Sequence, residues 1–225
     1  MAVIGVLPAA GHATRLQPLD CSKEVVEIRG RPVIDFIVER MRRGGCDELR
    51  IVTRPEKQDV VAYAERIGAK VVLGRPESVT ESFAAGFAGA DPDDVILIGW
   101  PDTLWEPDDG YATLVSALRG GADAALGLFR LERDLERSDV VVFGSDGQVA
   151  GIEIKPKSPK SDRIWGCAAA RAGRLDRFTA VEWPGEYWDL LCREGSNVAA
   201  VDLSDRWLDI GTHEALARAD AWLAG

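Results

Sequence analysis

Short apolar runs alternate with amphipathic stretches through the first half of the chain. Four short, mainly apolar runs predict strands over residues 3–7, 49–53, 70–73 and 95–98. Apolar residues at helical spacing predict helices between them, over residues 32–44, 59–67 and 80–90. Short strands that alternate with helices form βαβ units, so we predict a mainly parallel sheet.

The pattern changes after residue 121. Apolar runs predict strands over residues 122–131, 140–143, 149–154 and 164–171, and the turn signal at residues 145–148 predicts a hairpin. A last helix is predicted over residues 212–223, with Thr212 as its N-cap. The predicted fold class is therefore α/β: a Rossmann-like three-layer sandwich with a mixed, mainly parallel sheet and an antiparallel excursion.

Length, charge and cysteine content limit the number of domains, the partners and the cellular location that we expect. A length of 225 residues favours one domain, residues 1–225, with a first half over 1–121 and a second over 122–225. The net charge of −10 argues against a protein that wraps nucleic acid. No signal-peptide pattern and no apolar run of roughly 18 residues is visible. The four cysteines show no metal-binding spacing, which favours reduced thiols, so we expect a cytoplasmic protein without a membrane or nucleic-acid partner.

The loop after the first predicted strand is the strongest candidate for chemistry. Small side chains let backbone N–H groups approach a polyanion closely, and two cations eight positions apart follow them. The loop matches neither G-x-G-x-x-G nor G-x-x-x-x-G-K-[ST]. We still predict that it binds the phosphates of a nucleotide; the residues concerned are Leu7, Ala9, Ala10, Gly11, Thr14, Arg15 and Lys23.

The segment Ala13-Thr14-Arg15-Leu16-Gln17-Pro18, with Lys23 after it, resembles the opening signature of the sugar-1-phosphate nucleotidyltransferases, as in glucose-1-phosphate thymidylyltransferases. Near the other end, residues 207–212 (WLDIGT) resemble that family's W-x-D-x-G-T motif. The resemblance implies nucleotidyl transfer from a nucleoside triphosphate to a sugar 1-phosphate, which gives an NDP-sugar and pyrophosphate. It also implies that Arg15 and Lys23 are catalytic.

Two aspartates are candidate Mg²⁺ ligands, because Mg²⁺ favours one or two carboxylates completed by water and substrate phosphates. Asp102 follows the strand predicted over residues 95–98, at the end where open α/β sheets bind ligands. Asp209 is assigned to the metal through the late motif. Without a metal, Asp102 would be a residue of a surface turn. Asp209 would be a carboxylate near the start of a helix, where the helix dipole favours a negative charge.

The middle motifs are looser. Residues 153–156 (EIKP) resemble the family's E-E-K-P segment, which implies that Glu153 and Lys155 bind the acceptor, although Lys155 is equally compatible with a solvated lysine. Gly166 would let the sugar approach, and Pro76 and Ser78 fall in the run that faces the nucleobase. The aromatic residues Trp183, Trp188 and Trp222 are interpreted as packing residues.

Three departures from the family pattern bear on specificity. Ile154 replaces a glutamate that binds a sugar hydroxyl, Asp139 stands where a glycine is expected, and no base-reading glutamine precedes Pro76. We therefore expect retained phosphate and metal machinery with altered sugar and base recognition. Two alternatives stay open: a cytidylyltransferase that acts on a non-sugar phosphate, and a non-catalytic nucleotide-binding regulator.

Overall fold

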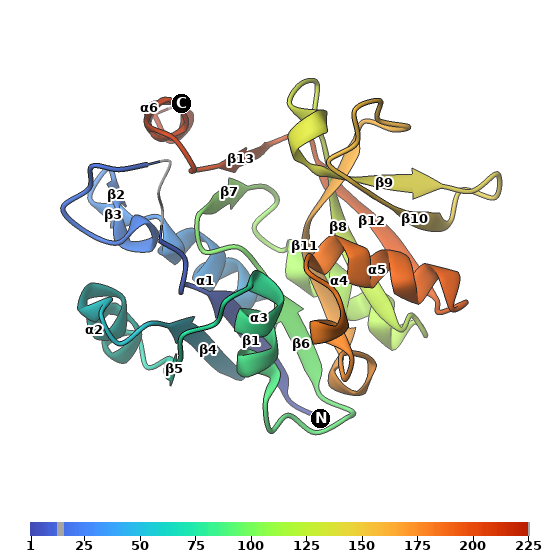
Figure 1. The fold of residues 1–225 in the computed structure, drawn as a ribbon, viewed down its shortest axis with the longest axis horizontal. Helices are drawn as coiled ribbons and strands as arrows, with labels where there is room; N and C mark the ends of the chain where they lie inside the picture. Colours follow the sequence, from blue (N-terminus) through green and yellow to red (C-terminus); the bar gives the residue numbers. More distant parts are fainter. Residues whose placement is uncertain (13–15, 225) are drawn as a thin grey trace.

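A computed structural model describes residues 1–12 and 16–224 of the chain. A central sheet has helices on both faces (Figure 1). The predicted fold class, a three-layer α/β sandwich with a mixed sheet, is confirmed. Each helix in these two ranges is too short or too polar to cross a lipid bilayer.

The first half of the chain builds the parallel part of the sheet. Its strands are β1 (Val3–Pro8), β4 (Glu48–Thr53), β5 (Lys70–Leu73) and β6 (Val95–Ile98). β1 pairs in parallel with both β4 and β6, and β4 pairs in parallel with β5. The carboxyl ends of these strands therefore meet at one edge of the sheet, where ligands bind in such folds.

The second half continues the same sheet, mainly in antiparallel pairing, as predicted from the hairpin signal. Its strands are β8 (Ala124–Arg130), β9 (Asp139–Phe143), β10 (Val149–Ile154), β11 (Arg163–Arg171) and β12 (Val198–Ser204). One edge of β11 pairs with β6 and, near its start, with β9; its other edge pairs with β8. β11 thus joins the two halves of the molecule.

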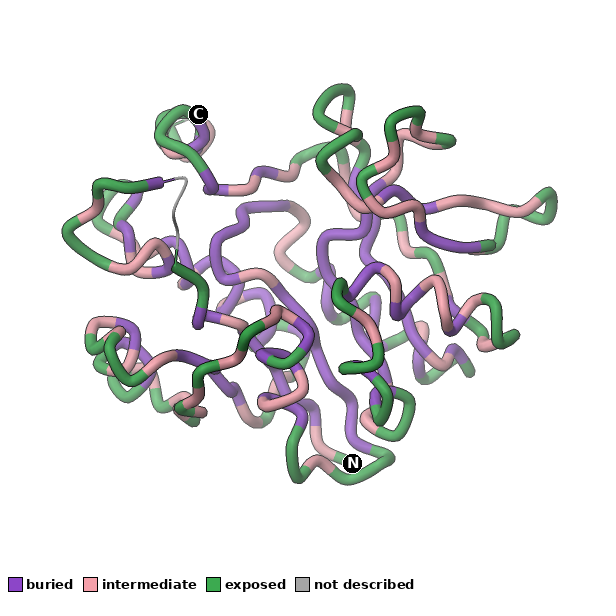
Figure 2. The backbone as a smooth tube through the Cα atoms, in the orientation of Figure 1, coloured by how far each residue is buried: buried purple, intermediate pink, exposed green. Residues whose placement is uncertain are grey.

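The helices bury apolar stripes against the two faces of the sheet. On one face, α1 (Ile34–Arg43), α2 (Gln58–Arg66) and α4 (Gly110–Arg119) contribute to a core cluster that includes Ile37, Tyr63 and Leu114. On the opposite face, α3 (Val79–Phe87) and α5 (Pro184–Arg193) contribute to a second cluster that includes Phe83 and Trp188. The buried middle of the sheet between them is visible in Figure 2.

Smaller elements position the cleft described below. β7 (Thr103–Trp105) pairs with β13 (Trp207–Asp209), and a third apolar cluster packs α6 (His213–Trp222) near them. A small ribbon joins β2 (Glu27–Ile28) and β3 (Arg31–Pro32). Short 3₁₀ turns are η1 (Lys23–Val25), η2 (Leu135–Arg137), η3 (Ala172–Arg174) and η4 (Phe178–Ala180).

Candidate active site

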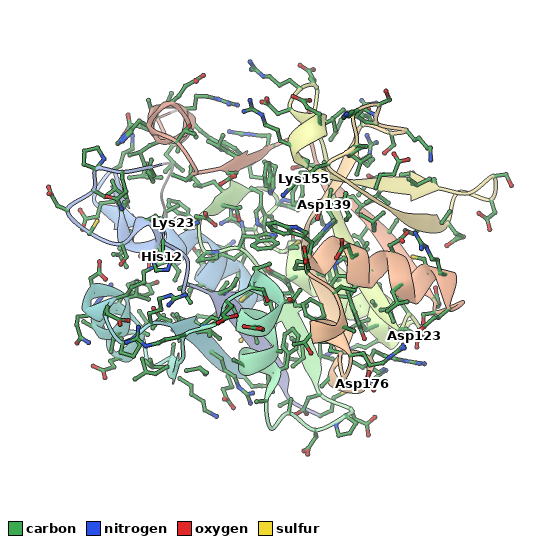
Figure 3. The ribbon with its side chains drawn as sticks, viewed as in Figure 1. His12, Lys23, Asp123, Asp139, Lys155 and Asp176 are labelled. Atoms are coloured by element: carbon green, nitrogen blue, oxygen red, sulfur yellow. The ribbon has the colours of Figure 1, made fainter. Side chains whose placement is uncertain are left out.

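A cleft of about 1080 Å³ opens at the carboxyl ends of β1, β4 and β6. Its walls come from both halves of the chain: the loop after β1, the start of α3 and the turn after β6 on one side, and residues near β9, β10 and α5 on the other. Figure 3 shows His12 and Lys23 at one end and Asp139 and Lys155 at the other. The two ends of the cleft could therefore hold two different reactants.

The loop after β1 is held through its carbonyl groups. Arg54 donates from Nε to the Ala10 carbonyl oxygen at 2.8 Å, and Lys57 donates from Nζ to the carbonyl oxygens of Ala9 at 2.7 Å and Gly11 at 3.2 Å. To the residues that the structure describes, the N–H groups of Ala10 and Gly11 donate no hydrogen bond. The carbonyl oxygens of this loop thus face cationic side chains of the protein. The N–H groups of Ala10 and Gly11 remain available to bind an anion.

Lys23 and Asp102 form an ion pair at the floor of the cleft. Lys23 begins η1, and its Nζ lies 2.5 Å from Oδ2 of Asp102, which is buried in the turn after β6. Burial of the Lys23 ammonium acts to lower its pKa, but the carboxylates of Asp102, Glu24 and Asp209 outweigh burial and raise it. Lys23 therefore carries a fixed positive charge in this cleft.

The pairing of β7 with β13 brings Asp209 beside Asp102. Asp209 lies opposite Thr103 in that ladder, and the N–H of Ile210 donates to the Asp102 carbonyl oxygen at 2.8 Å. Two carboxylates and an ammonium from three distant segments therefore converge beside the small-residue loop. In the part of the chain that the structure describes, no group of three or more His, Cys, Asp or Glu side chains converges to hold a metal. Two carboxylates with access to phosphate oxygens nevertheless form a donor set that suits Mg²⁺.

The opposite end of the cleft is lined by aromatic side chains, by the basic residue Lys155 and by the acidic residue Asp139. The Lys155 ammonium lies 3.7 Å from the centre of the Trp183 ring, which is 40% exposed. Trp183 does not pack in the core, so our interpretation of this residue is wrong, whereas Trp188 is fully buried. Burial raises the pKa of the Asp139 carboxyl, while the nearby Trp165 indole and Lys155 ammonium act to lower it.

Eight of the residues assigned from the sequence line the cleft: Ala10, Gly11, Lys23, Pro76, Ser78, Asp102, Lys155 and Asp209. Ser78 also accepts a hydrogen bond from the Glu81 N–H as the N-cap of α3. Leu7 and Ala9 are buried beneath the loop. Thr14 and Arg15 lie outside the described residues.

Among the residues described, Glu153 and Gly166 do not line the cleft. Glu153 pairs with Lys160 at 2.6 Å, and hydrogen bonding to this lysine lowers the pKa of the Glu153 carboxyl. Gly166 lies where the register of β11 against β8 shifts, and a Cβ there would come within 2.8 Å of the Phe129 ring and 2.7 Å of Trp207 Nε1. Close packing against Phe129 and Trp207 thus explains why residue 166 is a glycine, and the approach of a sugar is not needed to explain it.

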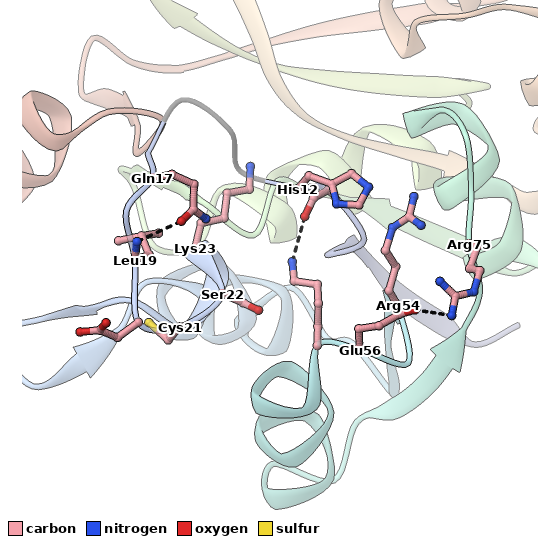
Figure 4. Close-up of a pocket in the computed structure, with 12 residues that line it drawn as sticks. His12, Gln17, Leu19, Cys21, Ser22, Lys23, Arg54, Glu56 and Arg75 are labelled. Carbon is pink, nitrogen blue, oxygen red and sulfur yellow. Dashed lines mark hydrogen bonds and ion pairs between the residues drawn. The ribbon is translucent and has the colours of Figure 1, made fainter.

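Sequence reasoning missed Arg54 and Lys57. Both follow β4, whose carboxyl end lies next to that of β1, so their place in a βαβ unit was the signal that could have found them. Lys57 also pairs with the buried Glu24 at 2.6 Å, and burial raises the pKa of this glutamate. A second pocket of about 480 Å³ adjoins the cleft here and shares Gly11, His12, Lys23 and Arg54 with it (Figure 4).

Comparison with known proteins places the chain in a family. Residues 5–152 match the MobA-like NTP transferase domain. A glucose-1-phosphate thymidylyltransferase of Neisseria meningitidis is 24% identical over 97% of this chain and 82% of its own length. A 3-deoxy-manno-octulosonate cytidylyltransferase of Anaeromyxobacter sp. is 30% identical over 97% of this chain and 96% of its own length.

The fold has a close counterpart among solved structures. The crystal structure of a Bacillus anthracis protein provisionally named a glucose-1-phosphate thymidylyltransferase, in complex with a sucrose, superposes with a TM-score of 0.84 at 21% identity. The superposition covers 98% of this chain and 95% of that one. With the match over residues 5–152, the chain belongs to the MobA-like NTP transferase domain family and is a nucleotidyltransferase.

Proposed function

We propose that this protein transfers a nucleotidyl group from a nucleoside triphosphate to a sugar 1-phosphate and releases pyrophosphate. The observation that carries the proposal is the convergence of Lys23, Asp102 and Asp209 beside the loop after β1. This arrangement offers fixed charges of both signs where phosphates would lie. This arrangement supports transfer of a nucleotidyl group with the help of a metal ion.

In the proposed reaction, an oxygen of the acceptor phosphate attacks the α-phosphorus of the nucleotide. The bond from that phosphorus to the bridging oxygen breaks, and pyrophosphate leaves with the electron pair. The chain has little covalent work to do, so positioning and charge neutralisation carry the rate. Lys23 neutralises phosphate charge at the loop, and Arg15 is assigned the same role through its motif.

The donor set at Asp102 and Asp209 fits Mg²⁺, and these two carboxylates would hold it. Bound there, the ion would neutralise charge on the phosphates of the nucleotide. Lys23 keeps its positive charge because of the same carboxylates. Asp102 therefore has two roles in the proposal: it holds Lys23 in place and supplies a metal ligand.

We assign the nucleotide to the half formed by residues 1–121 and the acceptor to residues 122–225. The first half supplies the loop and Lys23, and the second supplies Lys155, whose ammonium could pair with the acceptor phosphate. The glucose-1-phosphate thymidylyltransferase among the relatives supports a sugar phosphate as acceptor. All four cysteines are free thiols, which is consistent with our placement of the reaction in the cytoplasm.

Cytidylyl transfer is the second candidate. The relative with 30% identity over nearly its whole length is a 3-deoxy-manno-octulosonate cytidylyltransferase, and its name supports the cytidylyl part of this candidate. Asp139, which lines the acceptor end of the cleft, lies opposite Ile154 in the ladder of β9 and β10. This candidate retains the same attack at the α-phosphorus and differs from the first in the base and in the acceptor, a phosphate carried by a group other than a sugar.

A pyrophosphate-release assay tests the proposal. ATP, GTP, CTP, UTP and dTTP are each combined with a panel of sugar 1-phosphates and alcohol phosphates in the presence of Mg²⁺. We expect release that depends on both the nucleotide and the acceptor. Nucleotide binding without turnover in any combination would instead indicate a regulator and would overturn the proposal.

A further inference from the structure

Arg54 bridges two loops of the nucleotide half. Its Nε donates to the Ala10 carbonyl oxygen at 2.8 Å, and its Nη2 donates to the Pro76 carbonyl oxygen at 2.9 Å. Ala10 belongs to the loop after β1, and Pro76 precedes α3. The two bonds fix the plane of a guanidinium that lines both the cleft and the adjoining pocket.

Several N–H groups of the Arg54 guanidinium donate no hydrogen bond to the described residues. Arginine has five N–H donors, and the two bonds to carbonyl oxygens use one from Nε and one from Nη2. Nη1 donates to no residue in the described ranges 1–12 and 16–224. Two N–H groups of Nη1 and one of Nη2 therefore remain for a ligand, and the orientation of the guanidinium is set before the ligand binds.

Arg54 lies between the loop after β1 and the run that precedes α3, with a hydrogen bond to each. In Figure 4, Lys23 and Arg54 lie on opposite sides of His12. Lys23 pairs with Asp102, whereas Arg54 bonds to Pro76, in the run that the family resemblance assigns to the nucleobase. A nucleotide with its phosphates near Lys23 would direct its base toward Arg54.

We propose that Arg54 reads the nucleobase and selects a base that presents two adjacent hydrogen-bond acceptors. This inference rests on the proposed function. Arginine donates and cannot accept, so a paired contact requires acceptors on two neighbouring atoms. Cytosine offers N3 and O2, and guanine offers O6 and N7.

The same geometry disfavours uracil and thymine. Their N3–H donor lies between two carbonyl oxygens, so it would face the N–H groups of the guanidinium. Adenine places its amino group next to N1 and N7 and likewise lacks adjacent acceptors. A paired contact of arginine with a base contributes a discrimination of about 5- to 150-fold.

Equilibrium binding of CTP, GTP, UTP and dTTP without an acceptor tests the inference, because it requires no turnover. The wild-type protein should bind CTP or GTP at least about 5-fold more tightly than UTP and dTTP. In Arg54→Gln, the side chain has a donor and an acceptor, and this preference should fall to about 2-fold or less. Inorganic pyrophosphate serves as the phosphate-only probe for the Ala10 contact, and its loss of affinity should be smaller than the loss for CTP or GTP.

Two further variants are measured: Arg54→Lys, which keeps the charge, and Arg119→Gln, which is the control. Arg54→Lys keeps the charge but cannot span two carbonyl groups and a base edge, so it should also lose the preference. Arg119 is exposed at the end of α4, and Arg119→Gln makes the same change in charge far from the cleft. Thermal unfolding shows whether each variant is folded, and the assay is read only on folded protein.

Three results would overturn the inference. They are a wild-type preference for UTP or dTTP, a preference that survives in both Arg54 variants, and an equal loss of affinity for every nucleotide and for pyrophosphate. The last result would place Arg54 on the phosphates. Pyrophosphate release in the acceptor panel would in each case leave the proposed transfer reaction standing, so the two claims fail separately.

Discussion

At the scale of single residues, the charge of Lys23 is the feature on which the proposed chemistry depends most. We expect Lys23→Ala to lower kcat by about two orders of magnitude or more, the scale of removing one preorganised charge donor. Lys70→Ala is the matched control, since Lys70 lies exposed on β5. Steady-state pyrophosphate release measures both. Activity of Lys23→Ala within threefold of the wild type would show that this lysine has no role in the transfer.

The two aspartates are tested through their metal. We expect Asp102→Asn and Asp209→Asn each to abolish Mg²⁺-dependent turnover, whereas Asp146→Asn in the β9–β10 turn should leave it unchanged. Activity is measured against Mg²⁺ concentration, and a wild-type dependence in either variant excludes that aspartate as a ligand. Because Asp102 is buried against Lys23, its variant should also lose stability, which urea unfolding measures separately.

At the scale of elements, the Lys57–Glu24 pair ties η1 to α2 and to the loop after β1. The Glu24 side chain is fully buried and that of Lys57 is 13% exposed. Lys57→Met should therefore destabilise the fold by about 3 kcal/mol, because it leaves a buried carboxylate unpaired. The double variant Lys57→Met/Glu24→Gln should recover much of this loss in urea unfolding. A double variant as unstable as the single one would contradict the assignment.

The same pair makes a prediction about pH. Burial raises the pKa of Glu24 in the folded protein. Ionisation of Glu24 therefore lowers the free energy of unfolding once the pH exceeds the pKa of a glutamate in the unfolded chain, about 4.3. Loss of Lys57 raises the pKa of Glu24 in the folded protein further. The destabilisation of Lys57→Met should thus be largest near neutral pH and shrink as the pH falls toward about 4.3. A loss that stays constant over this range would show that the charge of Glu24 is not its cause.

The ladder between β9 and β10 carries the prediction about the acceptor. Asp139 and Ile154 lie opposite each other, and a side chain at Gly185 would meet both. A carboxylate expected at position 154 is therefore found at the paired position 139. A carboxylate can accept bonds from hydroxyl groups and isoleucine cannot, so glucose 1-phosphate should be a poor substrate.

Moving the carboxylate back tests this idea. The double variant Asp139→Gly/Ile154→Glu should gain activity on glucose 1-phosphate relative to the preferred acceptor, and Asp139→Gly alone should not. Steady-state kinetics with the nucleotide that supports the fastest pyrophosphate release give the ratio of kcat/KM values. A wild-type kcat/KM of about 10⁴ M⁻¹s⁻¹ or more on glucose 1-phosphate would contradict the prediction.

At the scale of the whole molecule, local patterns predicted the fold well. The strands at residues 70–73, 95–98 and 149–154 match β5, β6 and β10, and Thr212 caps α6 as predicted. Helix α4 was missed although Tyr111, Leu114, Val115 and Leu118 are buried at helical spacing. Helix α5 and strand β12 were missed as well.

The site was harder to predict because it depends on contacts between distant segments. Asp102 and Asp209 were identified one at a time, but their approach requires the pairing of β7 with β13, two strands of three residues that leave little local pattern. Glu153 was assigned from a motif and instead pairs with Lys160. Packing around Gly166 was invisible for the same reason, since Phe129 and Trp207 come from other strands.

In the proposed reaction the α-phosphate of the nucleotide, and no other, is transferred to a phosphorylated acceptor, together with the nucleoside. The most direct test incubates the protein and Mg²⁺ with an acceptor and a nucleotide labelled with ³²P at either the α or the γ position. We expect the α label in an acceptor product joined through a pyrophosphate linkage, while the γ label leaves as pyrophosphate. Transfer of the γ label to the acceptor, or release of the α label as free nucleoside monophosphate without an acceptor product, would contradict it.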